Sequence, residues 1–80
     1  MKNKDNYDQV FIETFSVDKN ELNDKLEYNT IEAWDSIGHM QMIAELEDAF
    51  EIEFEMDDII NFSSYSIGVE LLAKYGVEIK

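Results

Sequence analysis

The chain of 80 residues contains no cysteine and no proline, only three glycines, and six basic residues against nineteen acidic ones. Without cysteine, neither a disulfide framework nor a thiolate metal site is possible. No hydrophobic run approaches the length of a membrane-spanning helix, and the residues that follow Met1 lack the apolar core of a signal peptide. We therefore expect a cytoplasmic protein without a membrane-inserted segment.

The scarcity of basic residues leaves a formal net charge of −13 at pH 7. A surface of this kind repels nucleic acid and anionic membranes and attracts proteins that carry basic patches. Disorder is not the expected outcome, because 45% of the residues are hydrophobic and 12% are aromatic. This length and composition predict one domain, residues 1–80, with a modest core.

Hydrophobic residues recur at helical spacing in four places, which predicts an all-α fold, a small bundle of three main helices plus one short helix. The predicted helices span residues 5–15, 37–50, 56–62 (the short one) and 65–75. In the first helix, Tyr7, Val10, Phe11 and Phe15 are expected to face inward, and Asp8 is expected on the solvated face.

A long loop, residues 16–34, separates the first two predicted helices. Because it exceeds the usual connection of about four to six residues, a structureless course is not expected. We predict a short helical turn between Lys19 and Leu26, and tethers to the core at Leu22, Leu26 and Ile31. Trp34 is expected to pack at the end of the core, since large aromatic side chains are usually buried anchors.

Asp35 and Ser36 stand at the start of the second predicted helix, and both are residue types favoured at helix N-caps. Ser36 lies in the first turn, where free N–H groups and the positive end of the helix dipole favour a phosphate. From the local chemistry alone, an ordinary capping serine is the simpler interpretation.

Two other groups of residues suggest chemistry but do not support it. Asp35, Ser36 and His39 lie within five positions, yet Asp35 is badly placed to reach behind the imidazole, and the chain has no glycine-rich elbow. We assign no catalytic residue, expect no enzyme activity, and place His39 at the surface or at the edge of a groove. The acidic stretch 18–29 lacks the glycine and the final glutamate of a calcium-binding loop, so no metal site is predicted.

A wider pattern surrounds Ser36. The residues Asp35-Ser36-Ile37, followed by Leu46-Glu47 and Phe50, resemble the Asp-Ser-Leu and Leu-Glu-x-x-Phe signature of acyl carrier proteins. The fuller string, Trp-Asp-Ser-x-x-His-Met, resembles stand-alone carriers outside the main fatty-acid branch. The resemblance implies that Ser36 carries a covalent 4′-phosphopantetheine arm derived from coenzyme A, and that Asp35 helps the modifying enzyme to bind its metal ion. Because cysteine is absent, any thioester sulfur must come from that cofactor.

The resemblance also implies a function and a set of partners. The chain would hold acyl or aminoacyl intermediates as thioesters and present them to partner enzymes. Those partners are a phosphopantetheinyl transferase (holo-synthase), an acyl- or aminoacyl-loading ligase, and acyltransferases or synthases with basic docking patches. We expect the carrier itself to be a monomer. In the family the helix after the serine docks on partners, which implies contacts through Ile37, Met40, Ala44, Glu47 and Asp48.

Cargo on the arm is expected to slide between the second and third helices into an interior for acyl chains. The residues expected to line that interior are Phe11, Phe15, Ile43, Leu46, Phe50, Ile59, Ile67 and Leu71.

Several positions depart from the carrier pattern. Gly38 and Gln41 occupy positions that are typically acidic in fatty-acid carriers, and Glu55 replaces the proline common before the third helix. These departures favour a specialised pathway, for a secondary metabolite, a modified fatty acid or a surface polysaccharide. The alternatives are a peptidyl or aminoacyl carrier of nonribosomal type, and a non-carrier acidic module for protein interactions.

The surplus of acidic residues predicts that added salt or divalent cations raise the melting temperature, because repulsion between like charges weakens the folded state. Thermal unfolding followed by circular dichroism across a salt titration measures this effect. A melting temperature that stays constant through the titration contradicts the prediction.

Overall fold

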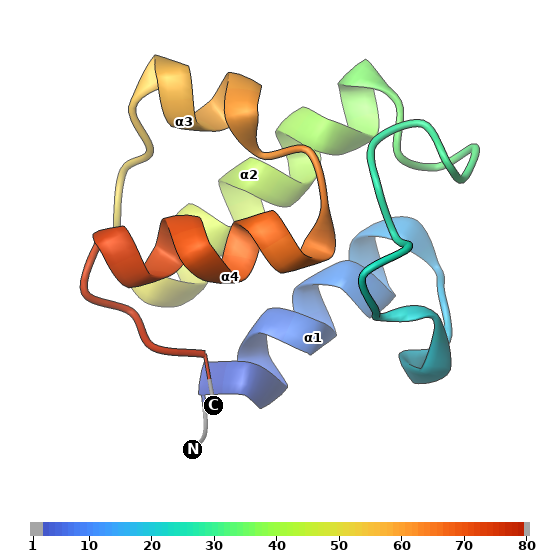
Figure 1. Ribbon diagram of the computed structural model, residues 1–80, viewed down its shortest axis with the longest axis horizontal. Helices are drawn as coiled ribbons and strands as arrows, with labels where there is room; N and C mark the ends of the chain where they lie inside the picture. The colour runs from blue at the N-terminus through green and yellow to red at the C-terminus, as the bar shows by residue number, and fades with distance from the viewer. Residues whose placement is uncertain (1–2, 80) are drawn as a thin grey trace.

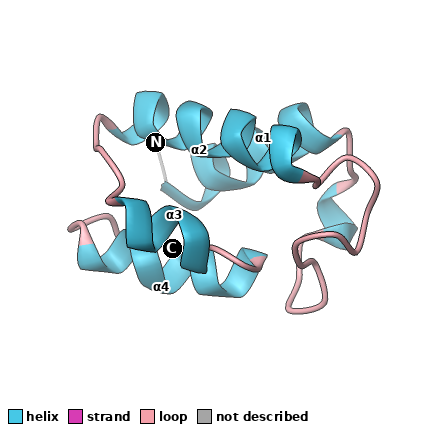
Figure 2. Ribbon diagram, turned by 90° about the horizontal axis from the view of Figure 1, so that it is seen from above, coloured by secondary structure: helices cyan, strands magenta, loops and turns pink. Residues whose placement is uncertain are grey.

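The computed structural model describes residues 3–79, which form four α-helices and one short 3₁₀ turn, without a β-strand. The helices are α1 (Asn3–Phe15), α2 (Ser36–Phe50), α3 (Met56–Asn61) and α4 (Tyr65–Lys74), and the 3₁₀ turn is η1 (Lys19–Glu21) (Figure 1). The predicted all-α bundle of three main helices and one short helix is confirmed. In the view of Figure 2, α1 and α2 lie in one layer and α3 and α4 in the other. Within residues 3–79, no helix is long and apolar enough to cross a membrane.

The core between the two layers is built largely from aromatic rings. Its fully buried side chains are Tyr7, Phe11, Trp34, Met42, Ile43, Leu46, Phe62 and Leu72. The Phe11 ring centroid lies 4.9 Å from that of Tyr7 and 5.6 Å from those of Phe15 and Trp34. Aromatic pairs at such spacings contribute about 0.5–1.5 kcal/mol each beyond the area that they bury. The inward stripe predicted for α1 is therefore confirmed.

Asp8 is buried, so its predicted place on the solvated face of α1 is wrong. Only 3% of the residue is exposed. One carboxylate oxygen accepts a 2.5 Å hydrogen bond from the Tyr65 hydroxyl, and the other accepts a 2.7 Å bond from Lys4 Nζ. A carboxylate tolerates burial when both of its oxygens have donors. Burial and the neighbouring Asp8 raise the pKa of Tyr65 to about 12, so this link between α1 and α4 holds well above neutral pH.

The long loop between α1 and α2 is tied to the junction of α3 and α4. The Tyr28 N–H donates to the Ser63 carbonyl, and the Tyr65 N–H donates to the Leu26 carbonyl, both at 2.9 Å. The predicted tethers hold, since Leu26 is buried and Leu22 and Ile31 pack against the core. The helical turn predicted within 19–26 is present but covers only η1. These two backbone bonds bring Tyr28 next to the end of α3.

Helix α4 comes closer to the core than hydrophobic spacing indicates, because Gly68 faces inward. A Cβ atom at position 68 would lie 2.2 Å from Phe62 Cζ and 2.2 Å from the Tyr7 hydroxyl oxygen. Leu72, one turn later, is fully buried, whereas Ile67, which was expected inward, is only half-buried. The contact face of α4 therefore centres on the glycine.

Substituting Gly68→Ala is expected to lower the free energy of unfolding by about 1–3 kcal/mol, the usual cost of overpacking a core. This outcome opposes helix propensity, which favours alanine by about 1 kcal/mol. Urea unfolding of the two proteins measures the difference. Glu70→Ala, at an exposed position of the same helix, is the control and should stay within about 0.5 kcal/mol of the wild type. A Gly68→Ala protein of wild-type stability would mean that α4 and Phe62 separate without cost.

Candidate functional site

Helix α2 begins at Ser36, and its N-cap residue is Asp35. Asp35 has an extended backbone, and its Oδ1 accepts a 2.8 Å hydrogen bond from the Gly38 N–H. The capping role that both residue types favour therefore belongs to Asp35. Ser36 is exposed at the first position of the helix. Its hydroxyl is consequently accessible to another protein and is not the group that caps α2.

The start of α2 is pressed against the loop that precedes it. A Cβ atom at Gly38 would lie 2.0 Å from the Ala33 carbonyl oxygen and 3.3 Å from Phe15 Cε1. This contact explains a glycine at a position where the carrier pattern has an acidic residue. Beside it, the Trp34 ring is fully buried and stacks on Phe15 at a centroid distance of 5.0 Å. The predicted packing role of Trp34 is confirmed.

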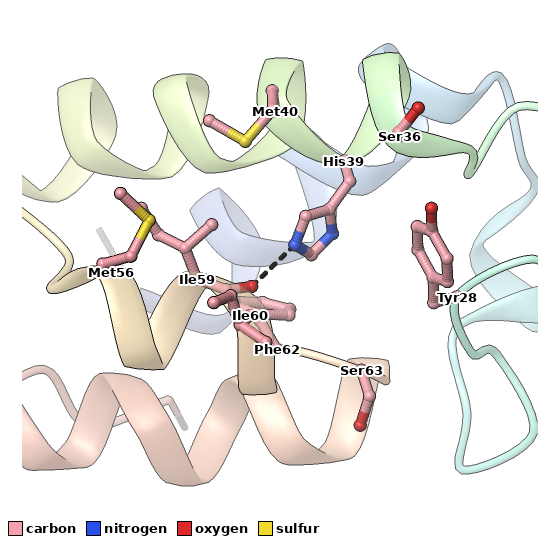
Figure 3. Close-up of a pocket in the computed structure, with 9 residues that line it drawn as sticks. All are labelled: Tyr28, Ser36, His39, Met40, Met56, Ile59, Ile60, Phe62 and Ser63. Carbon is pink, nitrogen blue, oxygen red and sulfur yellow. Dashed lines mark hydrogen bonds between the residues drawn. The ribbon is translucent and has the colours of Figure 1, made fainter.

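A hollow of about 380 Å³ opens between α2 and α3 beside Ser36. The residues that line it are Tyr28, Ser36, His39, Met40, Met56, Ile59, Ile60, Phe62 and Ser63 (Figure 3). None of the nine is an acidic or a lysine residue, although the chain has nineteen acids. Met40, Met56 and Ile60 are 52%, 71% and 71% exposed, so large apolar side chains stand at its rim. The hollow suits an uncharged, apolar group.

The hollow lies where cargo was expected, between α2 and α3, but its walls differ from the prediction. Of the eight residues expected to line an interior, only Ile59 is among those that line the hollow. Phe11, Phe15, Ile43 and Leu46 are buried in the packed core instead. Phe50, Ile67 and Leu71 are partly buried and lie outside the hollow.

His39 lines the hollow and spans the space between α2 and α3, so of its two predicted places the edge of a groove is confirmed and a plain surface role is wrong. Its Nδ1 accepts a 2.9 Å hydrogen bond from the Trp34 indole N–H, and its Nε2 lies 2.8 Å from the Ile59 carbonyl oxygen (Figure 3). Because an indole N–H can only donate and a carbonyl can only accept, the ring proton resides on Nε2. Both nitrogens are engaged, and neither is free to act as a base toward Ser36.

The predicted partner contacts on α2 differ in how free they are. Ile37 is 70% exposed, and Ala44 and Asp48 are exposed together with Met40. Glu47 is half-buried, and its carboxylate accepts a 2.9 Å hydrogen bond from the Phe54 N–H. Glu47 therefore holds the connection between α2 and α3, which limits its use as a free charge for a partner.

Sequence reasoning missed the rim residues contributed by other elements. Met56 and Ile60 reach the hollow from α3, and Tyr28 reaches it from the long loop (Figure 3). A signal for the first two was available. They are two apolar residues four positions apart on a helix of six residues, so they share one side of it. Because Ile59 already packs against the core, that side is left exposed. No local signal identifies Tyr28, because the bonds between the loop and Ser63 place it there.

Helix α3 is fixed to α4 by Asp58, whose carboxylate oxygens lie 3.1 and 3.0 Å from Lys74 Nζ. The Tyr75 hydroxyl also donates to this carboxylate, and it accepts a 2.9 Å bond from the Glu55 N–H. Hydrogen bonds from Tyr75 and Lys74 lower the pKa of Asp58. A helix of six residues is not stable by itself, so such bonds determine where α3 lies.

Within residues 3–79, no group of three or more His, Asp or Glu side chains is arranged to hold a metal ion. Comparisons with models of known protein families, with curated proteins and with solved structures give no match for this chain.

Asp58→Asn is expected to destabilise the protein near neutral pH, and this effect should shrink in acid. Because the folded-state pKa lies below the ordinary value of 3.8, the carboxylate's contribution is complete above that value and is lost as the pH falls through the folded-state pKa. Urea unfolding of both proteins between about pH 7 and about pH 2 measures the difference. Asp57→Asn, at the exposed neighbouring position, is the control. An Asp58→Asn effect of equal size at both ends of the range contradicts the assignment.

Proposed function

We propose that this protein is a carrier that holds an acyl group as a thioester on a 4′-phosphopantetheine arm attached to Ser36, and presents it to partner enzymes of a specialised pathway. The observation that supports this most is the exposed Ser36 hydroxyl at the first position of α2, beside an apolar hollow, with the cap supplied by Asp35. The motif from Trp34 to Met40 supports the same function through its resemblance to carrier proteins.

The first turn of α2 suits the phosphodiester that would join the arm to Ser36. Backbone N–H groups there have no partner within the helix, and the dipole favours negative charge. The arm would come from coenzyme A, and the transferase would supply the catalysis. Asp35 is exposed and uses Oδ1 for its cap, so its other oxygen is available to the metal ion of that enzyme.

The lining of the hollow favours an acyl cargo over an aminoacyl cargo. An ammonium group that entered would lose its water without finding a carboxylate among the nine lining residues. An alkyl chain, in contrast, would gain roughly 0.8 kcal/mol for each methylene group removed from water. The methionines at the rim adapt easily to different shapes, which suits cargo that enters and leaves.

Partner recognition would combine long-range and short-range terms. The net charge of −13 would speed encounters with enzymes that carry basic patches. Ile37 and Met40, which are exposed three positions apart on the first turns of α2, would then supply apolar contacts close to the arm. Ala44 and Asp48 continue this exposed side of the helix.

Incubation of the purified protein with coenzyme A, Mg²⁺ and a promiscuous phosphopantetheinyl transferase is expected to add the mass of one arm. Ser36→Ala should gain none, because the acceptor oxygen is missing. Ser63→Ala removes another exposed hydroxyl from the same hollow and should be modified like the wild type. Intact-mass spectrometry reads all three. If the wild type stays unmodified while a known carrier in the same tube is converted, the proposed function is wrong.

The opposing class is an acidic module that binds a basic protein in place of nucleic acid. The charge alone supports it, and it gives no account of the motif around Ser36. An unmodified chain that competes with DNA for a basic protein would favour this function instead.

A further inference from the structure

The end of α3 is capped by a side chain from a different helix. The last four carbonyl groups of an α-helix have no partner within it, and the Ile59 carbonyl is one of those of α3. The Nε2–H group of His39, which belongs to α2, supplies the missing donor at 2.8 Å. In Figure 3 the imidazole ring extends from α2 to α3, with Met40 and Met56 on one side of it and Ser36 and Tyr28 on the other.

The imidazole ring of His39 is held in this position by its surroundings. Its plane lies 16° from that of the Trp34 indole, whose N–H donates to Nδ1. The rings of Tyr28 and Phe62 stand nearly perpendicular to it, at 82° and 77°, with centroids 5.6 and 6.2 Å away. Trp34 and Phe62 are fully buried. The ring therefore cannot swing aside without breaking both of its hydrogen bonds.

We propose that His39 determines how deep, and hence how long, an acyl chain the hollow accepts. This inference rests on the proposed carrier function. A chain on the Ser36 arm can occupy the outer space bordered by Met40, Met56 and Ile60, but deeper entry requires His39 to release the Ile59 carbonyl and leave it without a donor. The 380 Å³ of the hollow corresponds to about a dozen groups of the size of a water molecule. The end of the arm and a medium-length chain fill that space.

The test is the rate at which hydroxylamine cleaves butyryl, octanoyl and dodecanoyl thioesters on the modified protein, relative to the same acyl-pantetheines free in solution. Each methylene group that is buried favours the sheltered state roughly fourfold. For the wild type, protection is expected to rise from butyryl to octanoyl and to rise no further with dodecanoyl. In His39→Ala, dodecanoyl protection should exceed the wild-type value by roughly fourfold or more, since at least one further methylene enters.

Two variants separate this role from a general loss of structure. The amide of His39→Gln can accept from Trp34 and donate to Ile59, so it should restore the wild-type limit. Gln41→Ala changes an exposed residue on the same helix and should leave the limit unchanged. Equal dodecanoyl protection in His39→Ala and the wild type would overturn the proposal.

If His39→Ala fails to fold, the wild type alone still shows whether His39 limits how deep the acyl chain enters the hollow. Nitrogen-15 NMR spectra report the His39 Nε2–H and Trp34 Nε1–H groups in each loaded form. If protection keeps rising to dodecanoyl while both signals stay unchanged, His39 does not limit the depth. Intact mass is measured before any cleavage rate, so a chain that takes up no arm is recognised at once as a failure of the carrier function and of this inference with it.

Discussion

The indole ring of Trp34 links α1 to α2 and, through His39, to the end of α3. It stacks on Phe15 at the end of α1, contacts Phe11 edge-on, and donates its N–H to His39 on α2. His39 in turn reaches the end of α3. A fully buried indole needs a partner for its N–H, and the position of His39 follows from that need. This polar bond and the aromatic stack therefore fix where the exposed start of α2 lies.

Features that depend on neighbours in the sequence could be predicted, and features that depend on distant partners could not. The four helices follow from hydrophobic spacing, and the start of α2 follows from Asp35 and Ser36. The burial of Asp8 could not be inferred from α1 alone, because Lys4 on the same helix pairs with one carboxylate oxygen but the donor for the other is the Tyr65 hydroxyl, 57 residues away. In α4, a glycine inside a helix indicates a close contact at Gly68, and the structure confirms it, but the partners Phe62 and Tyr7 are recognised only once the helices are packed.

The candidate site likewise has features that the sequence predicts and features that it does not. The position of Ser36 in the first turn of α2 and the capping residue types were accessible from local sequence, whereas a hollow between α2 and α3 was expected only from the resemblance to carrier proteins. The residues that line the hollow could not be predicted, because Tyr28 is placed there by backbone hydrogen bonds between the loop and the junction of α3 and α4. The sequence places His39 only at the surface or at the edge of a groove, because a single histidine near a helix start has no visible partner. Its two partners, an indole N–H and a terminal helix carbonyl, are recognised only once the elements are packed.

The tight contact at Gly38 limits how the neighbourhood of Ser36 can vary. Any side chain there would collide with the Ala33 carbonyl, so a carboxylate cannot be installed at position 38 unless the preceding loop moves. Gln41, one turn later and exposed, is not constrained in this way. Of the two positions that depart from the acidic pattern, only position 41 can therefore take a new carboxylate without a shift of the backbone. At position 38 the backbone of the preceding loop leaves room for glycine alone.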